Sequence, residues 1–255
     1  ITRQKVANYR SDRIYVNDTL VSDGSTDAVI VNLPDSSKGV SLLFLNVYEP
    51  DTSVAFRTFT ADQLAGDDQK KPVKRAKPNK PVLMPTTANV IDEILRQGFA
   101  IVVGVPDELN DAGKILPYLL PGKQSNVFKT FRSKDVTHTG TPHGLDFDVK
   151  GKPIMKRQKT VLPTKHNNRF LANLLALKIN IAASDAGKTP IGFGDLIYLD
   201  TQNSPWFTGQ SDWTVEDIAE LADDALTNWA GVPYQKYEDL NNVMTLINAS
   251  FADSL

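Results

Sequence analysis

Several features that this chain lacks narrow its possible functions. None of its 255 residues is a cysteine, which excludes disulfides, thiolate nucleophiles and cysteine-ligated zinc sites together. No run of about 18 apolar residues occurs, so we expect no membrane-spanning helix. The formal net charge is −2, whereas proteins that neutralise many phosphates carry a strong positive excess. We therefore expect no nucleic-acid partner.

Sequence signatures of common catalytic sites are missing as well. No Gly-x-Ser-x-Gly nucleophile elbow occurs. Residues 187–189 (Gly-Lys-Thr) have the end of a phosphate-binding loop, but Ala182 occupies the place of its first glycine. Residues 192–194 (Gly-Phe-Gly) are followed by neither the third glycine nor the helix of a dinucleotide-binding fingerprint. We therefore predict a chain that is not an enzyme and has no cofactor.

Apolar residues make up 41% of the chain, enough for a sizeable core. We predict an α+β fold, with a β-rich, sandwich-like domain over residues 1–60. The candidate strands are rich in β-branched and aromatic residues and are separated by turn-forming residues; they cover residues 13–16, 27–31, 40–48 and 54–59.

Residues 61–85 differ in composition from the segments on either side. Between positions 70 and 81 they hold six basic residues and three prolines, which suit neither a helix nor a central strand. We interpret this stretch as a linker or exposed loop. The alternative is an electrostatic contact to an acidic polymer or surface.

Residues 86–255 are predicted to form a helix-rich α+β module. Apolar residues at helical spacing indicate helices over residues 87–96, 110–120, 170–182, 214–229 and 240–251, and short apolar runs indicate strands over residues 99–103 and 195–199. Gly98 is expected to end the first helix. Thr214 and Asp217 form a variant capping box, which predicts where the fourth helix begins.

A long polar insertion, residues 122–166, interrupts this module and contains all three histidines of the chain. A long irregular segment in a compact domain is usually functional or mobile. His138 and His143, followed by Asp146 and Asp148, offer nitrogen and oxygen donors to a divalent metal ion. The alternative is a surface loop without a metal, because glycine and proline between the histidines argue against a helix that would align them. We therefore assign no metal ligand from the sequence.

Two tryptophans are candidates for ligand binding. Trp206 and Trp213 lie in a polar loop, where exposed indole rings are suited to stacking on sugars. Trp229 falls on an apolar helix face, which is typical of the core.

Several motifs of residues 98–252 resemble a recurrent module of large, secreted bacterial surface proteins, especially those exported by the type IX secretion system. The matching segments are residues 99–104, 115–121, 172–184, 192–197, 214–223 and 239–251. The resemblance implies an extracellular or cell-surface location and a structural role, and it supplies no catalytic residues. The sorting domain usual at the C-terminus of such proteins is absent from this sequence.

From these features we expect a secreted or cell-surface protein that acts in adhesion, scaffolding or extracellular assembly. Its partners would be other surface proteins or further copies of itself, as a homo-oligomer or filament. The alternatives are a glycan- or polymer-binding module that uses Trp206 and Trp213, and a metal-dependent hydrolase that uses His138, His143 and Asp146. Because the chain begins at Ile1, we expect a processed chain or a fragment of a longer one.

Overall fold

A computed structural model describes residues 56–66, 87–199, 205–207 and 213–252, together with three strands nearer the N-terminus; of residues 87–89 and of these strands only the backbone is described. The chain divides into two compact units, Ile1–Ala55 and Phe56–Leu255. Strands in the first unit and mostly helices in the second make the fold α+β.

The strands of the first unit form one antiparallel sheet. β1 (Ser11–Val16) pairs with β2 (Thr19–Ser22) on one edge and with β3 (Leu42–Val47) on the other. The predicted strand over residues 13–16 lies within β1, and β3 lies within the predicted strand over residues 40–48. The predicted strand over residues 27–31 lies outside the described residues. The described strands of this unit form a single sheet, so they do not include the second layer of a sandwich.

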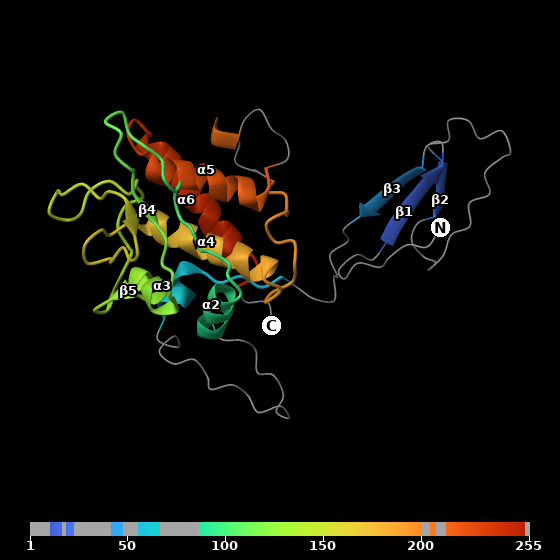
Figure 1. Ribbon diagram of the computed structural model, residues 1–255, viewed down its shortest axis with the longest axis horizontal. Helices are drawn as coiled ribbons and strands as arrows, with labels where there is room; N and C mark the ends of the chain where they lie inside the picture. The colour runs from blue at the N-terminus through green and yellow to red at the C-terminus, as the bar shows by residue number, and fades with distance from the viewer. Residues whose placement is uncertain are drawn as a thin grey trace, which may run out of the picture. The chain divides into compact units, whose positions relative to one another are not determined.

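Helix α4 (Arg169–Asp185) lies in the middle of the second unit and packs against α5 (Val215–Thr227) and α6 (Tyr234–Ala249) (Figure 1). Its side chains are buried on nearly every face, as the apolar sequence predicts. The helix begins where the Asn168 side chain accepts a hydrogen bond from the N–H of Phe170, a standard N-cap. It ends before Gly187, which has a positive φ of 64°.

The predicted capping box at the start of α5 is confirmed. The Thr214 hydroxyl accepts the N–H of Asp217 at 3.1 Å, and the Asp217 carboxylate accepts the N–H of Thr214 at 2.9 Å. Helix α6 then begins after Pro233, and its apolar stripe is buried as predicted, with the members Leu240, Val243, Met244 and Ile247.

Smaller elements surround this helical core. They are α1 (Ala61–Ala65), α2 (Thr87–Arg96), α3 (Gln124–Phe131), the 3-10 turn η2 (Pro205–Phe207) and the short strands β4 (Tyr118–Leu119), β5 (Arg132–Ser133), β6 (Val136–Thr137) and β7 (Arg157–Gln158). Helix α1 lies at the start of the range predicted as a linker, whose residues 67–85 are outside the described part.

Several predicted elements are wrong. Residues 110–120 form no helix, because the Asn110 side chain accepts hydrogen bonds from two following backbone N–H groups and closes a tight turn. Of the predicted strands, residues 99–103 and 195–199 contribute only isolated bridges, made by Val103 and Ile197. Of the predicted strand over residues 54–59, the described residues 56–59 form no strand: Phe59 exchanges two hydrogen bonds with the buried Asn180 side chain of α4.

Within the described part of the chain, no helix has both the length and the apolar character needed to cross a membrane.

Candidate functional site

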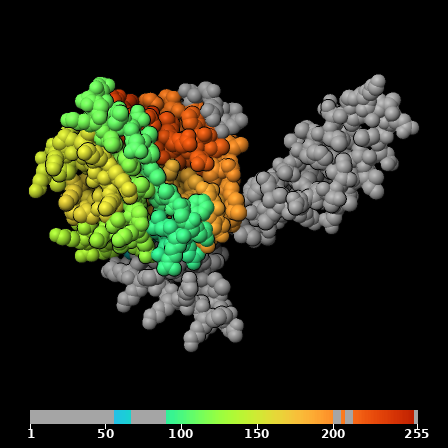
Figure 2. Space-filling view, viewed as in Figure 1, coloured from blue at the N-terminus to red at the C-terminus, as the bar shows by residue number. Residues whose placement is uncertain are grey.

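The predicted insertion, residues 122–166, begins with α3 and the β5–β6 hairpin and then runs back to the start of α4, irregular except for the short strand β7. In Figures 1 and 2 this 122–166 segment gathers at one end of the second unit, in yellow-green and yellow. Helix α3 was not predicted, because only Val127, Thr130 and Phe131 of it are buried.

Asn168 joins this segment to α4. The residue is fully buried, and each of its side-chain polar atoms has a partner. Its amide nitrogen donates to the carbonyl of His143 at 2.6 Å and faces Nε2 of His166 at 3.3 Å, while its backbone N–H donates to Nδ1 of His138 at 3.1 Å. Asn168 therefore caps the central helix with its side chain and, through its side chain and its backbone N–H, contacts three histidines of the segment.

Two glycines allow the segment to approach the helices closely. A Cβ atom on Gly144 would lie 2.0 Å from Cβ of Trp229, and one on Gly140 would lie 2.2 Å from the carbonyl oxygen of Asn167. Real Cβ atoms do not approach so closely, so larger residues would force the backbone to move. Next to Gly144, the N–H of Leu145 donates to the carbonyl of Leu226 in α5 at 2.8 Å.

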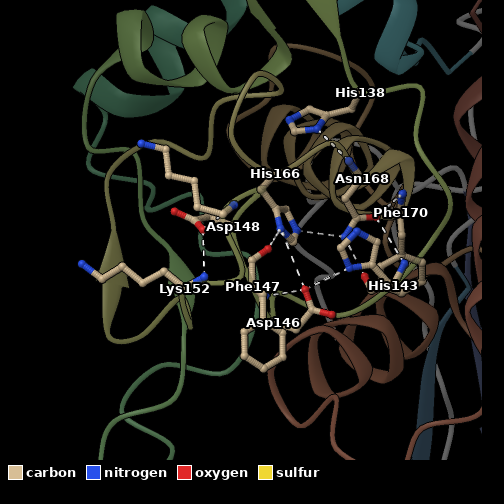
Figure 3. A network of polar contacts seen from close by, with 10 residues as sticks. His138, His143, Asp146, Phe147, Asp148, Lys152, His166, Asn168 and Phe170 are labelled. Carbon is tan, nitrogen blue, oxygen red and sulfur yellow. Dashed lines mark hydrogen bonds and ion pairs between the residues drawn. The ribbon is translucent and has the colours of Figure 1, made fainter.

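His143, Asp146 and His166 converge in this network (Figure 3). Oδ1 of Asp146 lies 3.1 Å from Nδ1 of His143 and 4.0 Å from Nδ1 of His166. The two imidazole rings meet edge to face, with centroids 4.7 Å apart. One donor atom from each of the three residues lies within 4.8 Å of the others, so the cluster has the donor types and the spacing of a small metal site.

The hydrogen bonds indicate which ring nitrogens carry protons. Nδ1 of His166 lies 3.0 Å from the carbonyl oxygen of Phe147, which only accepts, and Nε2 faces the amide group of Asn168, which donates. His166 is therefore neutral with its proton on Nδ1. Burial lowers its pKa further below the ordinary histidine value.

Asp146 is held in its ionised form. Burial alone would raise its pKa, but hydrogen bonds from the His143 ring and from the N–H of Phe147 outweigh that effect and lower the pKa.

The cluster differs from the candidate donor set in two residues. His138 is buried beside Asn168; burial, together with the nearby His166, lowers its pKa to about 4, and its Nε2 has no hydrogen-bond partner among the described residues. Asp148 accepts the N–H groups of Lys150 and Lys152, both at 2.9 Å, and closes a turn. His166 takes their place: it follows Asp146 by 20 residues, and the signal that pointed to it was the gathering of all three histidines in one segment.

The two candidate sugar-binding tryptophans already contact protein groups. The indole N–H of Trp206 donates to Asp239 at 2.7 Å, and that of Trp213 donates to the carbonyl of Phe207 at 3.2 Å. The Trp213 ring also packs edge to face on Phe207. A sugar would therefore have only ring faces to contact, and the predicted role in binding stays a prediction.

No protein-family model, curated protein or solved structure matches this chain. The resemblance to secreted bacterial surface proteins therefore stays a prediction from the sequence motifs of residues 98–252.

Proposed function

We propose that this protein is an extracellular or cell-surface assembly subunit, in which oppositely charged surfaces of neighbouring copies bind each other. The observation that carries this proposal is the separation of charge within the second unit. One end of that unit is basic and one of its helices is acidic, although the whole chain is close to neutral.

The basic surface is the 122–166 segment. It has ten basic residues against three acidic ones. Among the described residues, only Arg132 of these ten forms an ion pair, with Asp135 at 2.8 Å. The nine others are exposed: Lys123, Lys129, Lys134, Lys150, Lys152, Lys156, Arg157, Lys159 and Lys165.

The acidic surface is a ridge along α5. Glu216, Glu220 and Asp224 follow one another at four-residue spacing and are all exposed, so they lie on one face of the helix. None of them forms an ion pair with a described residue; Asp224 accepts a hydrogen bond from the Asn228 amide. Like charges at this spacing repel one another and destabilise the helix. A cationic partner would reduce this repulsion and so stabilise α5.

The two surfaces are different parts of one unit: α5 runs along its edge, and the 122–166 segment forms its end (Figure 1). A contact between the ridge of one copy and the basic segment of the next is heterologous. Contacts of this kind produce closed rings or open filaments, and complementary charge sets their orientation and speeds their formation. Each copy would therefore bind two neighbours, one at the ridge and one at the basic segment.

The remaining parts of the proposal derive from the sequence. The extracellular location follows from the resemblance of residues 98–252. A sandwich-like domain over residues 1–60 would offer a further contact surface between copies. Other surface proteins of complementary charge are the alternative partners. An acidic polymer on the basic segment is less favoured, because the ridge and the net charge of −2 would repel it.

Light scattering and negative-stain microscopy of the full chain test the proposal. We expect regular assemblies at about 0.05 M salt and a mass near the 28.1 kDa monomer at about 1 M salt, where screening acts over about 3 Å. A 28.1 kDa monomer at low salt and high protein concentration would contradict self-assembly.

A charge exchange makes the test specific. Glu216→Lys with Glu220→Lys reverses the ridge, and changing Lys150, Lys152, Lys156 and Lys159 to Glu leaves the basic segment with six basic residues against seven acidic ones. Each variant alone should remain monomeric, whereas an equimolar mixture should assemble, because both of its interfaces are again complementary. The matched control is Glu108→Lys with Asp111→Lys, which changes two exposed acids outside the ridge and should leave assembly intact.

A further inference from the structure

The cluster of His143, Asp146 and His166 has the geometry of an incomplete coordination sphere. Zinc bound tetrahedrally at about 2.0–2.1 Å holds its donors about 3.3 Å apart. The three donor atoms here lie within 4.8 Å of one another, and Asp146 is already 3.1 Å from one of its partners. Small side-chain movements would therefore bring all three donors to one ion.

The donor chemistry selects a class of metal. Two imidazoles and one carboxylate suit Zn²⁺ and neighbouring first-row ions, whereas Ca²⁺ and Mg²⁺ prefer shells made of oxygen.

The burial of the three side chains provides both support and access. His166 has only 1% of its side chain exposed, while His143 and Asp146 have 32% and 26% exposed. The buried His166 would thus bind the ion from the interior of the protein, and the ion would enter the site from solvent on the side of His143 and Asp146. A water molecule can complete the shell from the open side.

The protonation states also fit an ion. Metal ligands must be deprotonated carboxylates and neutral imidazoles. The lowered pKa of Asp146 keeps it ionised, and the lowered pKa of His166 keeps that ring neutral at neutral pH.

Binding has to compete with existing hydrogen bonds. Nδ1 of His166 now donates to the carbonyl of Phe147, and Nδ1 of His143 donates to Asp146, so each of these protons must move to Nε2 before Nδ1 can bind a metal. A proton on Nε2 of His166 would face the amide nitrogen of Asn168, and that side chain must turn in response. Metal binding should therefore be coupled to proton movement and to a change at the N-cap of α4.

We propose that His143, Asp146 and His166 bind one Zn²⁺-class divalent ion, which joins the middle of the 122–166 segment to its last residue, just before α4. The role assigned to this ion is structural, and the site does not depend on self-assembly.

Titration of the full, tag-free chain with ZnCl₂ tests the site, after removal of metals with EDTA and in high salt to keep the chain monomeric. Calorimetry should show one ion per chain, and thermal unfolding should shift upward on zinc addition. Asp146→Asn keeps an oxygen that accepts the N–H of Phe147 but loses the charge, and we expect at least a tenfold weaker affinity. His143→Ala should weaken binding at least as much. Asp148→Asn is the matched control, because this nearby carboxylate lies outside the cluster and should leave the affinity unchanged.

NMR of ¹⁵N-histidine-labelled protein provides a readout that does not depend on stability. The Nδ1 resonances of His143 and His166 should change to metal-bound positions, while those of His138 should not. The proposal fails if zinc binds with no defined stoichiometry, if Asp146→Asn and Asp148→Asn bind zinc as tightly as the unchanged chain, or if the ring resonances of His143 and His166 do not respond.

Discussion

The helices α4, α5 and α6 and the 122–166 segment are held in place by different forces. The helices pack apolar side chains, and α4 alone buries thirteen of its seventeen residues. The irregular part of the segment is fixed largely by hydrogen bonds from side chains to backbone, many of them made by Asn167 and Asn168. Apolar packing tolerates partial repacking, whereas a buried polar network loses most when one member is left unpaired. The two regions should therefore respond differently to mutation and to pH.

The largest effect is expected from a cavity in the helical region. Leu174 of α4 is fully buried, so Leu174→Ala should lower the free energy of unfolding by about 3–4 kcal/mol. Denaturant unfolding followed by tryptophan fluorescence measures this, because all three tryptophans lie in the second unit. The comparison is Leu246→Ala on α6, where the side chain is 53% exposed and we expect a loss of at most about 0.5 kcal/mol. Similar losses for both variants would mean that α4 is not the centre of the core.

Acid should weaken the segment before it weakens the apolar core. The pKa of His138 is about 4 in the folded chain and about 6.5 when unfolded. As the pH falls, the unfolded state therefore binds the proton before the folded state does. The contribution of neutral His138 to the free energy of unfolding is complete above about pH 6.5 and is lost progressively between about pH 6.5 and 4. The total loss is about 3 kcal/mol. His166, whose pKa is also lowered, acts in the same direction. Asp146 and Asp148 also have lowered pKa values, but their contribution is lost only at more acidic pH.

The measurement is the free energy of unfolding against pH in EDTA, for the unchanged chain and for His138→Gln. Glutamine keeps an acceptor for the N–H of Asn168 but does not titrate in this range. The variant should show a shallower decline between about pH 6.5 and 4. Equal slopes for both chains would show that His138 does not titrate as its burial implies.

The same contrast explains how much of the molecule the sequence predicted. The long central helix, the α5 capping box and the α6 stripe are confirmed, because each is encoded by local spacing or by a pair of residues three positions apart. The predicted helix over residues 110–120 is wrong, because its apolar pattern was outweighed by turn formation at Asn110.

The cluster was predicted only in part, for a related reason. His143 and Asp146 are near neighbours in sequence, so their contact follows from local spacing. The contact of Asp146 with His166 depends on how the chain returns to α4, which is set by Asn168 and by the close approaches at Gly140 and Gly144. These are tertiary contacts, and no periodic pattern of residues encodes them.

Removal of the network's central side chain should have an intermediate effect. Asn168→Ala deletes the N-cap of α4 and leaves the His143 carbonyl without its donor inside the protein, so we expect a loss of about 2 kcal/mol. The control is Asn228→Ala: this residue is partly exposed, and its side-chain amide has the exposed carboxylate of Asp224 as its one partner among the described residues. It should change stability by at most about 0.5 kcal/mol. Hydrogen exchange of the Leu145 and Val149 amides, which lie in the segment and donate to backbone carbonyls, should accelerate in Asn168→Ala alone. Unchanged exchange rates would show that Asn168 does not hold the segment in place.

The smallest effect is expected from Thr214, whose side chain caps the start of α5 as Asn168 caps the start of α4. Thr214→Ala removes the hydroxyl that accepts the N–H of Asp217 and should cost about 1 kcal/mol, whereas Thr214→Ser keeps the bond and should cost less. The loss should be smaller than at Asn168, because Thr214 is only partly buried and water can replace the missing acceptor. If Thr214→Ala proved as damaging as Asn168→Ala, the cap alone would account for the role of Asn168, and its contacts to the histidines would contribute little to stability.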